Sequence, residues 1–188
     1  MKRSMVDTVK FYLFLDEYKI DHEQLRSSLD DFTMKTGRNG VERIEGVLSN
    51  LRIAEQRYVL QIEGSLPRFF HGHNYRPLSI SELRCCIEAI SDRLHLPVER
   101  MGISRLDISD SVELPLRAKY YMDCLVSHPY LEREPRGKNG VYFENKSRHI
   151  TLYGKSEERK RKKQWVPDEF SGRNWLRIEH VHKRDIKD

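Results

Sequence analysis

The sequence predicts an α+β domain in which helices cover one face of a mainly antiparallel β-sheet and leave the other face to a ligand. Runs of β-branched and aromatic residues alternate with period two, as strands do, and other stretches repeat their apolar residues at helical spacing. These signals follow one another as strand, helix, strands, helix, strand, helix, hairpin and strand. The 188 residues fit a single domain, 1–188, that buries a core without disulfides.

In the first part of the chain, Val6 to Leu15 form the opening strand, because β-branched and aromatic residues dominate it. A helix begins after Asp21, which is placed to cap its first turn, and extends along a stripe of Leu25, Leu29 and Phe32. Two or three short strands then form a meander, through 41–48, 51–54 and 58–63.

The second part opens with a helix from Ser79 to Leu94, which carries a capping box because Glu82 lies three residues after Ser79. A strand and a shorter helix follow, at 102–112 and 116–126, and 132–138 form a polar connection. The ranges 140–144 and 149–155 form a hairpin joined at Asn145 and Lys146, and 175–182 form the last strand. The basic run at 157–165 is predicted to be a surface helix or loop.

The composition favours a folded protein with an anionic partner. Hydrophobic residues make up 38% of the chain and charged residues 34%, and the net charge is +5. Three cysteines are too few for a disulfide framework, so a reducing cytoplasm is expected. No stretch resembles a signal peptide or reaches membrane-spanning length, so no membrane association is expected.

Two predicted strands each present an arginine and an acid on one face. Arg105 and Asp107 share a face because side chains alternate along a strand, and Arg177 and Glu179 do the same on the last strand. Two carboxylates suit a hard cation such as Mg²⁺ or Mn²⁺, which needs few protein ligands when water and phosphate oxygens complete its shell. Cross-strand salt bridges are the alternative reading of the same pattern.

The segment from His149 to Lys155 places a tyrosine on a strand face. His149, Thr151, Tyr153 and Lys155 fall on one side of that predicted strand. Tyrosine is a poor nucleophile at its ordinary pKa of about 10, so a neighbouring cation such as Lys155 is needed to favour the phenolate. Ordinary packing of a tyrosine beside a lysine is the alternative.

The segment His71-Gly72-His73 invites comparison with the paired-histidine metal motif of many nicking enzymes. Its middle residue is glycine rather than a bulky apolar residue, and the following Asn74 and Tyr75 suggest a turn. Hydrogen bonding in that turn is therefore the main expectation, and a role for His71 or His73 in a metal site is left open.

Taken together and in this order, the motifs resemble the replication-initiation endonuclease of filamentous phages, the gene II family, and related rolling-circle replication proteins of plasmids and phages. The matching stretches are Gly72 to Asn74, Ile103 to Asp107, Ser147 to Lys155 and Leu176 to Glu179, and the opening Val6 to Lys10 also looks like the start of such proteins. Each motif is short, but their shared order across about two-thirds of the chain is more specific.

The resemblance implies the N-terminal nuclease domain of the family, with a Rep- or relaxase-like nicking fold. It implies a site-specific nick in one strand of a replication origin, with Tyr153 as nucleophile, Lys155 beside it, and Asp107 and Glu179 as metal ligands. Attack by the tyrosine gives a 5′-phosphotyrosine and a free 3′-hydroxyl that primes synthesis, and reversal of the attack rejoins a strand. The expected setting is the cytoplasm of a bacterial host, with a host helicase or polymerase as possible partner and a homodimer as possible assembly.

The resemblance also has departures. The spacing between the Ser147 segment and the tyrosine is shorter than in the phage enzyme, so Tyr142 on the partner strand is the substitute nucleophile. Family members commonly carry a further C-terminal portion beyond the last strand. The chain is therefore expected to be a truncated form, a minimal initiator, or a degenerate copy that retains only DNA binding.

Two other functions compete with the nuclease. A non-catalytic DNA-binding protein would hold phosphates through the sheet face and the basic run, with non-specific backbone contacts. The candidate DNA-binding residues under either function are the basic side chains of these elements: Arg105, Arg177, Arg159, Lys160, Arg161, Lys162 and Lys163. An RNA-binding module would stack bases on sheet aromatics such as Tyr58, Phe143 or Trp175.

Overall fold

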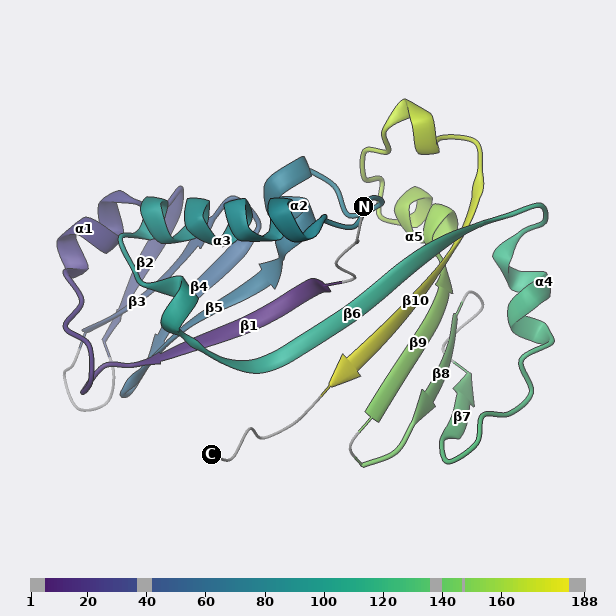
Figure 1. Cartoon of the computed structure of the whole chain (residues 1–188), viewed down its shortest axis with the longest axis horizontal. Coiled ribbons are helices and arrows are strands. Elements are labelled where there is room, and N and C mark those ends of the chain that lie inside the picture. The colour runs from purple at the N-terminus through teal and green to yellow at the C-terminus, as the bar shows by residue number, and fades with distance from the viewer. Residues whose placement is uncertain (1–5, 37–41, 136–139, 147, 183–188) are drawn as a thin grey trace.

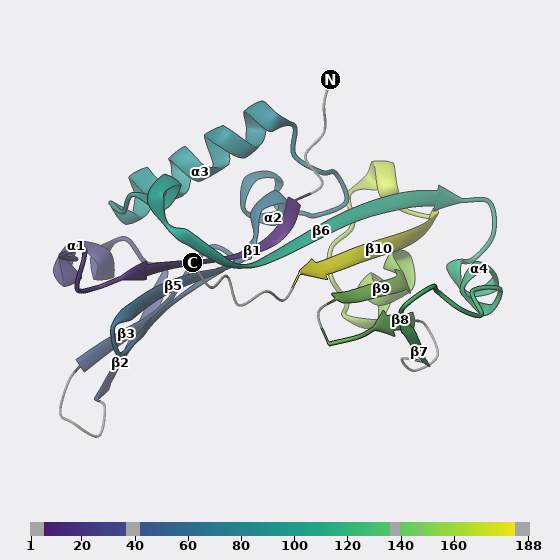
Figure 2. The ribbon, with the colours of Figure 1, turned by 60° about the horizontal axis from the view of Figure 1, so that its bottom comes forward.

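The computed structural model describes residues 6–36, 42–135, 140–146 and 148–182. Within them, ten strands form one sheet in the order β2-β3-β4-β5-β1-β6-β10-β9-β8-β7, and every described strand pair is antiparallel. The α+β fold class is therefore confirmed. Figures 1 and 2 show that the sheet consists of two halves joined where the long strand β6 crosses from one half to the other.

The first half contains five strands and three helices. The strands are β1 (Val6–Phe14), β2 (Asp31–Thr36), β3 (Glu42–Leu48), β4 (Leu51–Gln56) and β5 (Val59–Ser65). The helices α1 (His22–Ser27), α2 (Leu66–His71) and α3 (Ile80–Leu94) lie along one side of these strands (Figure 1). The capping box predicted for α3 is confirmed, because Ser79 accepts from the backbone of Glu82 and the Glu82 side chain accepts from the backbone of Ser79.

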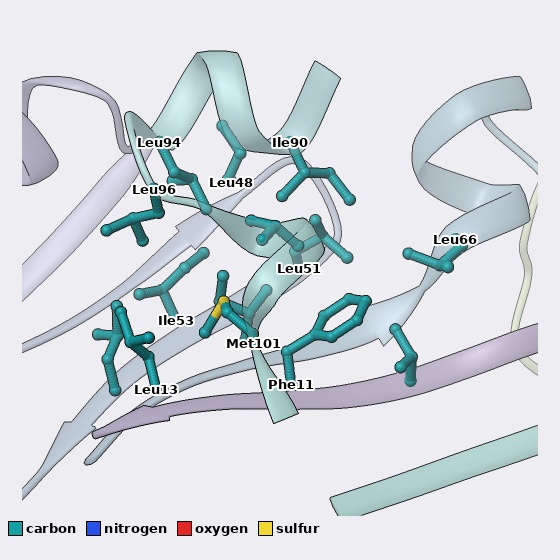
Figure 3. Packing of buried hydrophobic residues seen from close by; sticks show 14 of the residues in the cluster. Phe11, Leu13, Leu48, Leu51, Ile53, Leu66, Ile90, Leu94, Leu96 and Met101 are labelled. Carbon is teal, nitrogen blue, oxygen red and sulfur yellow. The ribbon is translucent and has the colours of Figure 1, made fainter. Parts of the chain in front are cut away.

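The apolar interior of this half lies between the helices and the sheet. Its fully buried side chains include Leu51 and Ile53 of β4, Leu60 of β5 and Ile90 of α3. Figure 3 shows the helical side chains facing those of the strands. This one-sided burial explains the alternation of buried and half-exposed positions along β1 and β5, which is what the sequence pattern predicts.

The second half contains the remaining strands and two helices, α4 and α5. After a 3₁₀ turn at Val98–Arg100 come β6 (Gly102–Leu114), α4 (Ala118–Asp123), β7 (Glu132–Pro135), β8 (Gly140–Glu144) and β9 (Arg148–Gly154). The helix α5 (Lys155–Arg161), a 3₁₀ turn at Asp168–Phe170 and β10 (Asn174–His182) complete it. A smaller apolar cluster joins Ala118 and Met122 of α4 to Ile150, Leu152 and Leu176 of the sheet.

Two predicted segments are wrong, and one helix was not predicted. The first helix, predicted to extend through Phe32, ends at Ser27, and Phe32 lies on β2 opposite Gly46. The polar connection predicted from Glu132 contains the strand β7, and the short helix α2 was not predicted. The strands β2 and β7 depend on pairing with the strands β3 and β8, and α2 depends on a cap, Ser65, at its start. Hydrophobic periodicity detects neither kind of contact.

The other elements follow the prediction more closely. The helix predicted at 116–126 is present but shorter, at Ala118–Asp123. Val41, the segment 136–138 and Ser147, to which the sequence analysis assigned roles, lie outside the described residues. Of the helices in the part of the chain that the structure describes, none is both long and apolar enough to span a bilayer.

Candidate active site

The predicted site residues come together on one face of three neighbouring strands, β6, β10 and β9. Glu179 of β10 lies opposite Ser109 on β6 and Thr151 on β9, and Arg177 lies opposite Ser111 and Tyr153. Asp107 lies two positions from Ser109 on β6 and shares its face. The strands therefore bring the phenol and both acids to the same side of the sheet.

Tyr153 is bonded to one of those acids. Its hydroxyl donates to Glu179 Oε1 at 2.7 Å. Burial and the neighbouring negative charge of Glu179 raise the pKa of Tyr153 above its usual value, so the phenol is neutral in this arrangement. A cation or an equivalent positive group must act on the phenol oxygen before it becomes a strong nucleophile.

Lys155 provides such a cation, but it lies on a helix and not on the strand to which the sequence analysis assigned it. It is the first residue of α5 rather than a strand residue, because β9 ends at Gly154. Its Nζ donates to the Tyr153 hydroxyl at 3.4 Å and to Glu158 Oε2 at 3.1 Å. Burial and the nearby Arg177 lower the pKa of Lys155 to about 8, against the opposing effect of Glu158. The ammonium is thus buried beside the phenol and close to losing its proton at mildly alkaline pH.

Arg177 organises the centre of the face. It is 3% exposed, and its guanidinium forms an ion pair with Asp7 of β1 at 2.6 Å. Further acceptors surround it: Ser109 Oγ at 2.6 Å, the Asn74 carbonyl at 2.7 Å, Ser111 Oγ at 3.1 Å and Glu179 Oε1 at 3.2 Å. The guanidinium is thus saturated by protein acceptors, so its placement suits holding Glu179 in position rather than the DNA contact predicted for it.

Asp107 and Arg105 form a second pair on the same face. Arg105 donates to both carboxylate oxygens of Asp107, at 2.8 and 2.7 Å, and also to Glu63 at 3.3 Å. Burial raises the pKa of the Asp107 carboxyl, which Arg105 counteracts, and Glu179 and Asp7 add to the rise through their charge. Burial and the charges of Glu179 and Asp7 therefore act against ionisation of Asp107, and Arg105 acts in favour of it.

The donor chemistry of Asp107 and Glu179 fits a hard cation, since both supply carboxylate oxygens from adjacent strands. Their oxygens hold arginine and phenol groups in this structure, and within the described ranges no cluster of three or more histidine, cysteine or acidic side chains forms a set of metal ligands. Arg105 is 40% exposed at its side chain, so it has room to turn away from Asp107. These two acids are the residues that would hold Mg²⁺ or Mn²⁺.

The histidines of the His71-Gly72-His73 segment lie in a turn. His71 is the last residue of α2, and Gly72 caps that helix with a left-handed φ of 77°. The two imidazole rings stack at 5.9 Å, and His73 Nδ1 accepts from the Tyr75 backbone N–H at 3.3 Å. Burial lowers the pKa of both histidines. The hydrogen-bonded turn is the arrangement that the sequence favoured for this segment.

The basic run divides into buried and exposed parts. Arg159 is 6% exposed, and its guanidinium donates to Gln164 and Asn74 and lies over the Tyr75 ring at 5.8 Å. The following side chains, Lys160 to Lys163, are exposed and are called here the basic surface. Arg159 is thus engaged with the protein, and the phosphate contacts predicted for this run stay a prediction for the basic surface.

One chain of polar side chains was not foreseen as a unit. Glu144 Oε2 and His149 Nδ1 are 2.7 Å apart, and His149 Nε2 and Thr151 Oγ1 are 2.9 Å apart. Thr151 lies opposite Glu179, so this chain ends beside the acid that holds Tyr153. The shared face of His149 and Thr151 was readable from period two, but the pairing with Glu144 depends on the hairpin register.

Comparison with known proteins gives the family of the chain. The model of the family described as the N-terminal part of the phage replication-associated protein, the gene II protein, matches residues 5–186. No curated protein gives a significant match. The family match confirms the resemblance to the filamentous-phage replication protein that the short motifs indicated. The matched residues include the face of β6, β10 and β9 that carries Asp107, Glu179 and Tyr153, called here the polar face. The chain therefore belongs to the N-terminal family of the gene II replication-associated proteins of phages.

Proposed function

We propose that this chain is a site-specific DNA endonuclease and strand transferase that starts rolling-circle replication through a 5′-phosphotyrosine on Tyr153. The observation that carries the proposal is the bond of 2.7 Å from the Tyr153 hydroxyl to Glu179, on a sheet face that also presents Asp107. Membership of a phage replication-associated family supports DNA at the origin as the substrate.

In the proposed reaction, the Tyr153 oxygen attacks the phosphorus of the scissile phosphodiester while its proton passes to Glu179, which already accepts that proton in a hydrogen bond. The bond from phosphorus to the 3′-oxygen breaks, and that oxygen leaves as a hydroxyl after taking a proton from solvent. The products are a 5′-phosphotyrosine and a 3′-hydroxyl, the group that a polymerase extends. The reverse attack by a 3′-hydroxyl restores the phosphodiester and the free tyrosine.

Neighbouring groups assist this attack. The Lys155 ammonium, 3.4 Å from the phenol oxygen, stabilises negative charge that develops there. Arg177 holds Glu179 in place through its bond of 3.2 Å. A Mg²⁺ or Mn²⁺ ion bound by Asp107 and Glu179 would supply polarisation of the phosphate. The basic surface would hold the DNA backbone, with affinity that falls as salt rises.

Non-catalytic DNA binding is the second candidate, and one observation favours it. The Tyr153 phenol is half-buried and its pKa is raised, so in this arrangement it is not activated for attack. A degenerate family member would keep the basic surface and lose the chemistry. Of the three aromatic side chains considered for RNA binding, Phe143 is 3% exposed in the apolar cluster beside α4 and offers no stacking surface, whereas Tyr58 is exposed and Trp175 is half-exposed.

The test is covalent trapping. Incubation with supercoiled phage replicative-form DNA and Mn²⁺ should give nicked circles and a protein–DNA adduct that survives denaturing electrophoresis. Tyr153→Phe should abolish the adduct, because it removes the attacking oxygen while keeping the ring. Its thermal unfolding, compared with that of the parent chain, reports whether the fold is retained.

Tyr142→Phe is the matched control, since it removes a hydroxyl from the neighbouring strand β8 on the same hairpin. This variant should still form the adduct. Trapping that persists in Tyr153→Phe and disappears in Tyr142→Phe would move the nucleophile to Tyr142. Binding of the DNA without any adduct in the parent chain would favour the non-catalytic candidate.

A further inference from the structure

A cavity of about 410 Å³ lies at one end of the polar face, between the segment that leads into α3 and the strands β6 and β10. Its walls include Tyr75 and Arg76 from that segment, Asp110 and Ser111 from β6, Trp175 from β10 and Phe170 from the preceding 3₁₀ turn. The proposed chemistry uses none of the aromatic side chains among these residues.

The aromatic walls form a corner of three rings. Tyr75 and Phe170 stack with their centroids 4.8 Å apart and their planes 18° apart. Trp175 meets Phe170 edge-on at 5.4 Å and 62°. Phe170 and Trp175 are half-exposed, whereas Tyr75 is buried. A flat, apolar ring that enters the cavity would therefore meet aromatic surface, on which bases of any identity can stack.

Polar groups line the same corner. The Tyr75 hydroxyl and Trp175 Nε1 are buried, and neither has a hydrogen-bond partner among the described residues. Both atoms are closed off from solvent, so the groups that the cavity offers to a ligand are the exposed side chains of Arg76 and Asp110. Asp110 adds an exposed carboxylate, which accepts from the Ser111 backbone N–H at 2.8 Å. The cavity thus combines stacking surface with a donor, Arg76, and an acceptor, Asp110, as a site for a nucleobase requires.

The cavity also adjoins the residues around Tyr153. Ser111, which lines it, accepts from Arg177 Nη1 at 3.1 Å. Trp175 precedes Arg177 by two residues on β10, and Arg177 lies opposite Tyr153. A second, narrow gap shares Tyr75 and Ser111 with the cavity and is also lined by Arg177. A nucleotide whose base entered the cavity would have its phosphate near the proposed nucleophile.

We propose that this cavity binds one unpaired nucleobase of the DNA strand, next to the phosphate that Tyr153 attacks. The base stacks against Phe170 and Trp175, and Asp110 accepts from an exocyclic amino group. Because a carboxylate pairs with an amino donor and not with a carbonyl, the cavity favours cytosine over thymine. This inference rests on the proposed function for the placement of the phosphate, but base binding itself does not require cleavage.

The experiment measures binding without cleavage. Fluorescein-labelled single-stranded 8-mers of dC, of dT and of an abasic sugar-phosphate chain are titrated with Tyr153→Phe protein, and anisotropy gives each Kd at one fixed salt concentration. The abasic chain isolates the backbone contribution. Phe170→Leu, which keeps an apolar side chain but removes the ring, should weaken binding of the dC 8-mer by roughly 5- to 150-fold. Its binding of the abasic chain should not change.

Two further variants sharpen the result. Tyr58→Ala removes a ring that is 71% exposed in the turn between β4 and β5, away from the cavity, and should change no Kd. Asp110→Asn should bring the dC and dT affinities together while abasic binding stays the same. Equal losses for base-containing and abasic chains in Phe170→Leu, or no loss for either, would overturn the inference. Failure of the phosphotyrosine test would leave these Kd comparisons interpretable, so the two proposals fail separately.

Discussion

The half of the sheet formed by β1 to β5 buries aliphatic side chains, whereas the half that contains β6, β10 and β9 also buries charges. Leu51, Ile53 and Leu60 are fully buried in the first half. In the second, Arg177 and Lys155 are 3% and 2% exposed. Burial of apolar area stabilises a fold by about 25 cal/mol per Å², but burial of an ion costs free energy unless partners compensate it. The comparison indicates that one half supplies stability and the other holds the buried charges on which the proposed chemistry depends.

The buried charges persist because each is paired. Asp7, 4% exposed, lies at the seam between the halves, where it accepts from Ser65 at 2.7 Å and pairs with Arg177. Arg177 in turn reaches both halves, since its acceptors include the Asn74 carbonyl from the segment before α3. The arginine therefore connects the face that carries Tyr153 to the stable half of the molecule.

The largest effect on stability is expected from breaking this pair. Arg177→Met keeps an unbranched side chain in place of the arginine stem but leaves the Asp7 carboxylate buried without its ion-pair partner. Removing one partner of a buried pair typically costs about 3–5 kcal/mol. Urea denaturation of the variant and the parent chain measures the change in free energy of unfolding.

A double variant tests the cause of that loss. Asp7→Asn combined with Arg177→Met removes the unpaired charge and should recover part of the lost free energy, which a double-mutant cycle quantifies. If the free energy of unfolding of Arg177→Met lay within about 0.5 kcal/mol of that of the parent chain, the variant would behave like an ordinary surface substitution. That result would contradict the view that paired charges hold this half together.

A smaller effect, with a characteristic pH dependence, is expected from Lys155. Burial lowers the pKa of Lys155 to about 8 from an ordinary value of 10.5, so between these pH values the folded protein releases a proton that the unfolded chain keeps. The penalty for burying the ammonium is complete below pH 8 and is relieved as the pH rises. The free energy of unfolding of the parent chain should therefore increase, relative to that of Lys155→Met, by about 3 kcal/mol across this window.

Denaturation of both proteins at several pH values between 7 and 10.5 measures that difference, in which groups common to both largely cancel. A difference that is flat with pH would show that the ammonium keeps its ordinary pKa in the folded protein. Lys35→Met, which removes a 66% exposed ammonium from β2, is the control and should show no such trend.

The contrast between the halves also explains how much of the fold the sequence predicts. Alternation predicted β1, β3 and the central strands because one of their faces is buried. The two strands that it missed, β2 and β7, form the two edges of the sheet. Their described side chains are almost all exposed, so their sequences carry no buried face, and only pairing with β3 and β8 makes them strands.

In the candidate site, too, the sequence predicted features of single strands and missed contacts between residues that are far apart in the chain. The shared face of Arg177 and Glu179 is local and was predicted from period two. The partners that bury Arg177 were not, since the Asn74 carbonyl lies 103 residues away in sequence. Lys155 was correctly placed beside Tyr153 but was assigned to the strand, whereas it is the first residue of α5. The chain turns from β9 into α5 at Gly154, which lies beside Ala118 of α4, and the periodicity of the sequence does not reveal that contact.

The smallest expected effect is in the apolar half and serves as the reference for the others. Ile90→Val deletes one methyl group from a side chain of α3 that is fully buried. Such a deletion typically costs about 0.5–1.5 kcal/mol, through lost transfer free energy and a small cavity. The loss should not vary between pH 7 and 10.5, since the core around Ile90 is made of hydrophobic residues.

Because the Ile90→Val substitution lies outside the polar face, oligonucleotide binding and adduct formation should match the parent chain at temperatures well below unfolding. Reduced adduct formation by a fully folded Ile90→Val protein would mean that the core of the apolar half also affects the reaction at Tyr153. The assignment of stability to one half and of the proposed chemistry to the other would then be wrong.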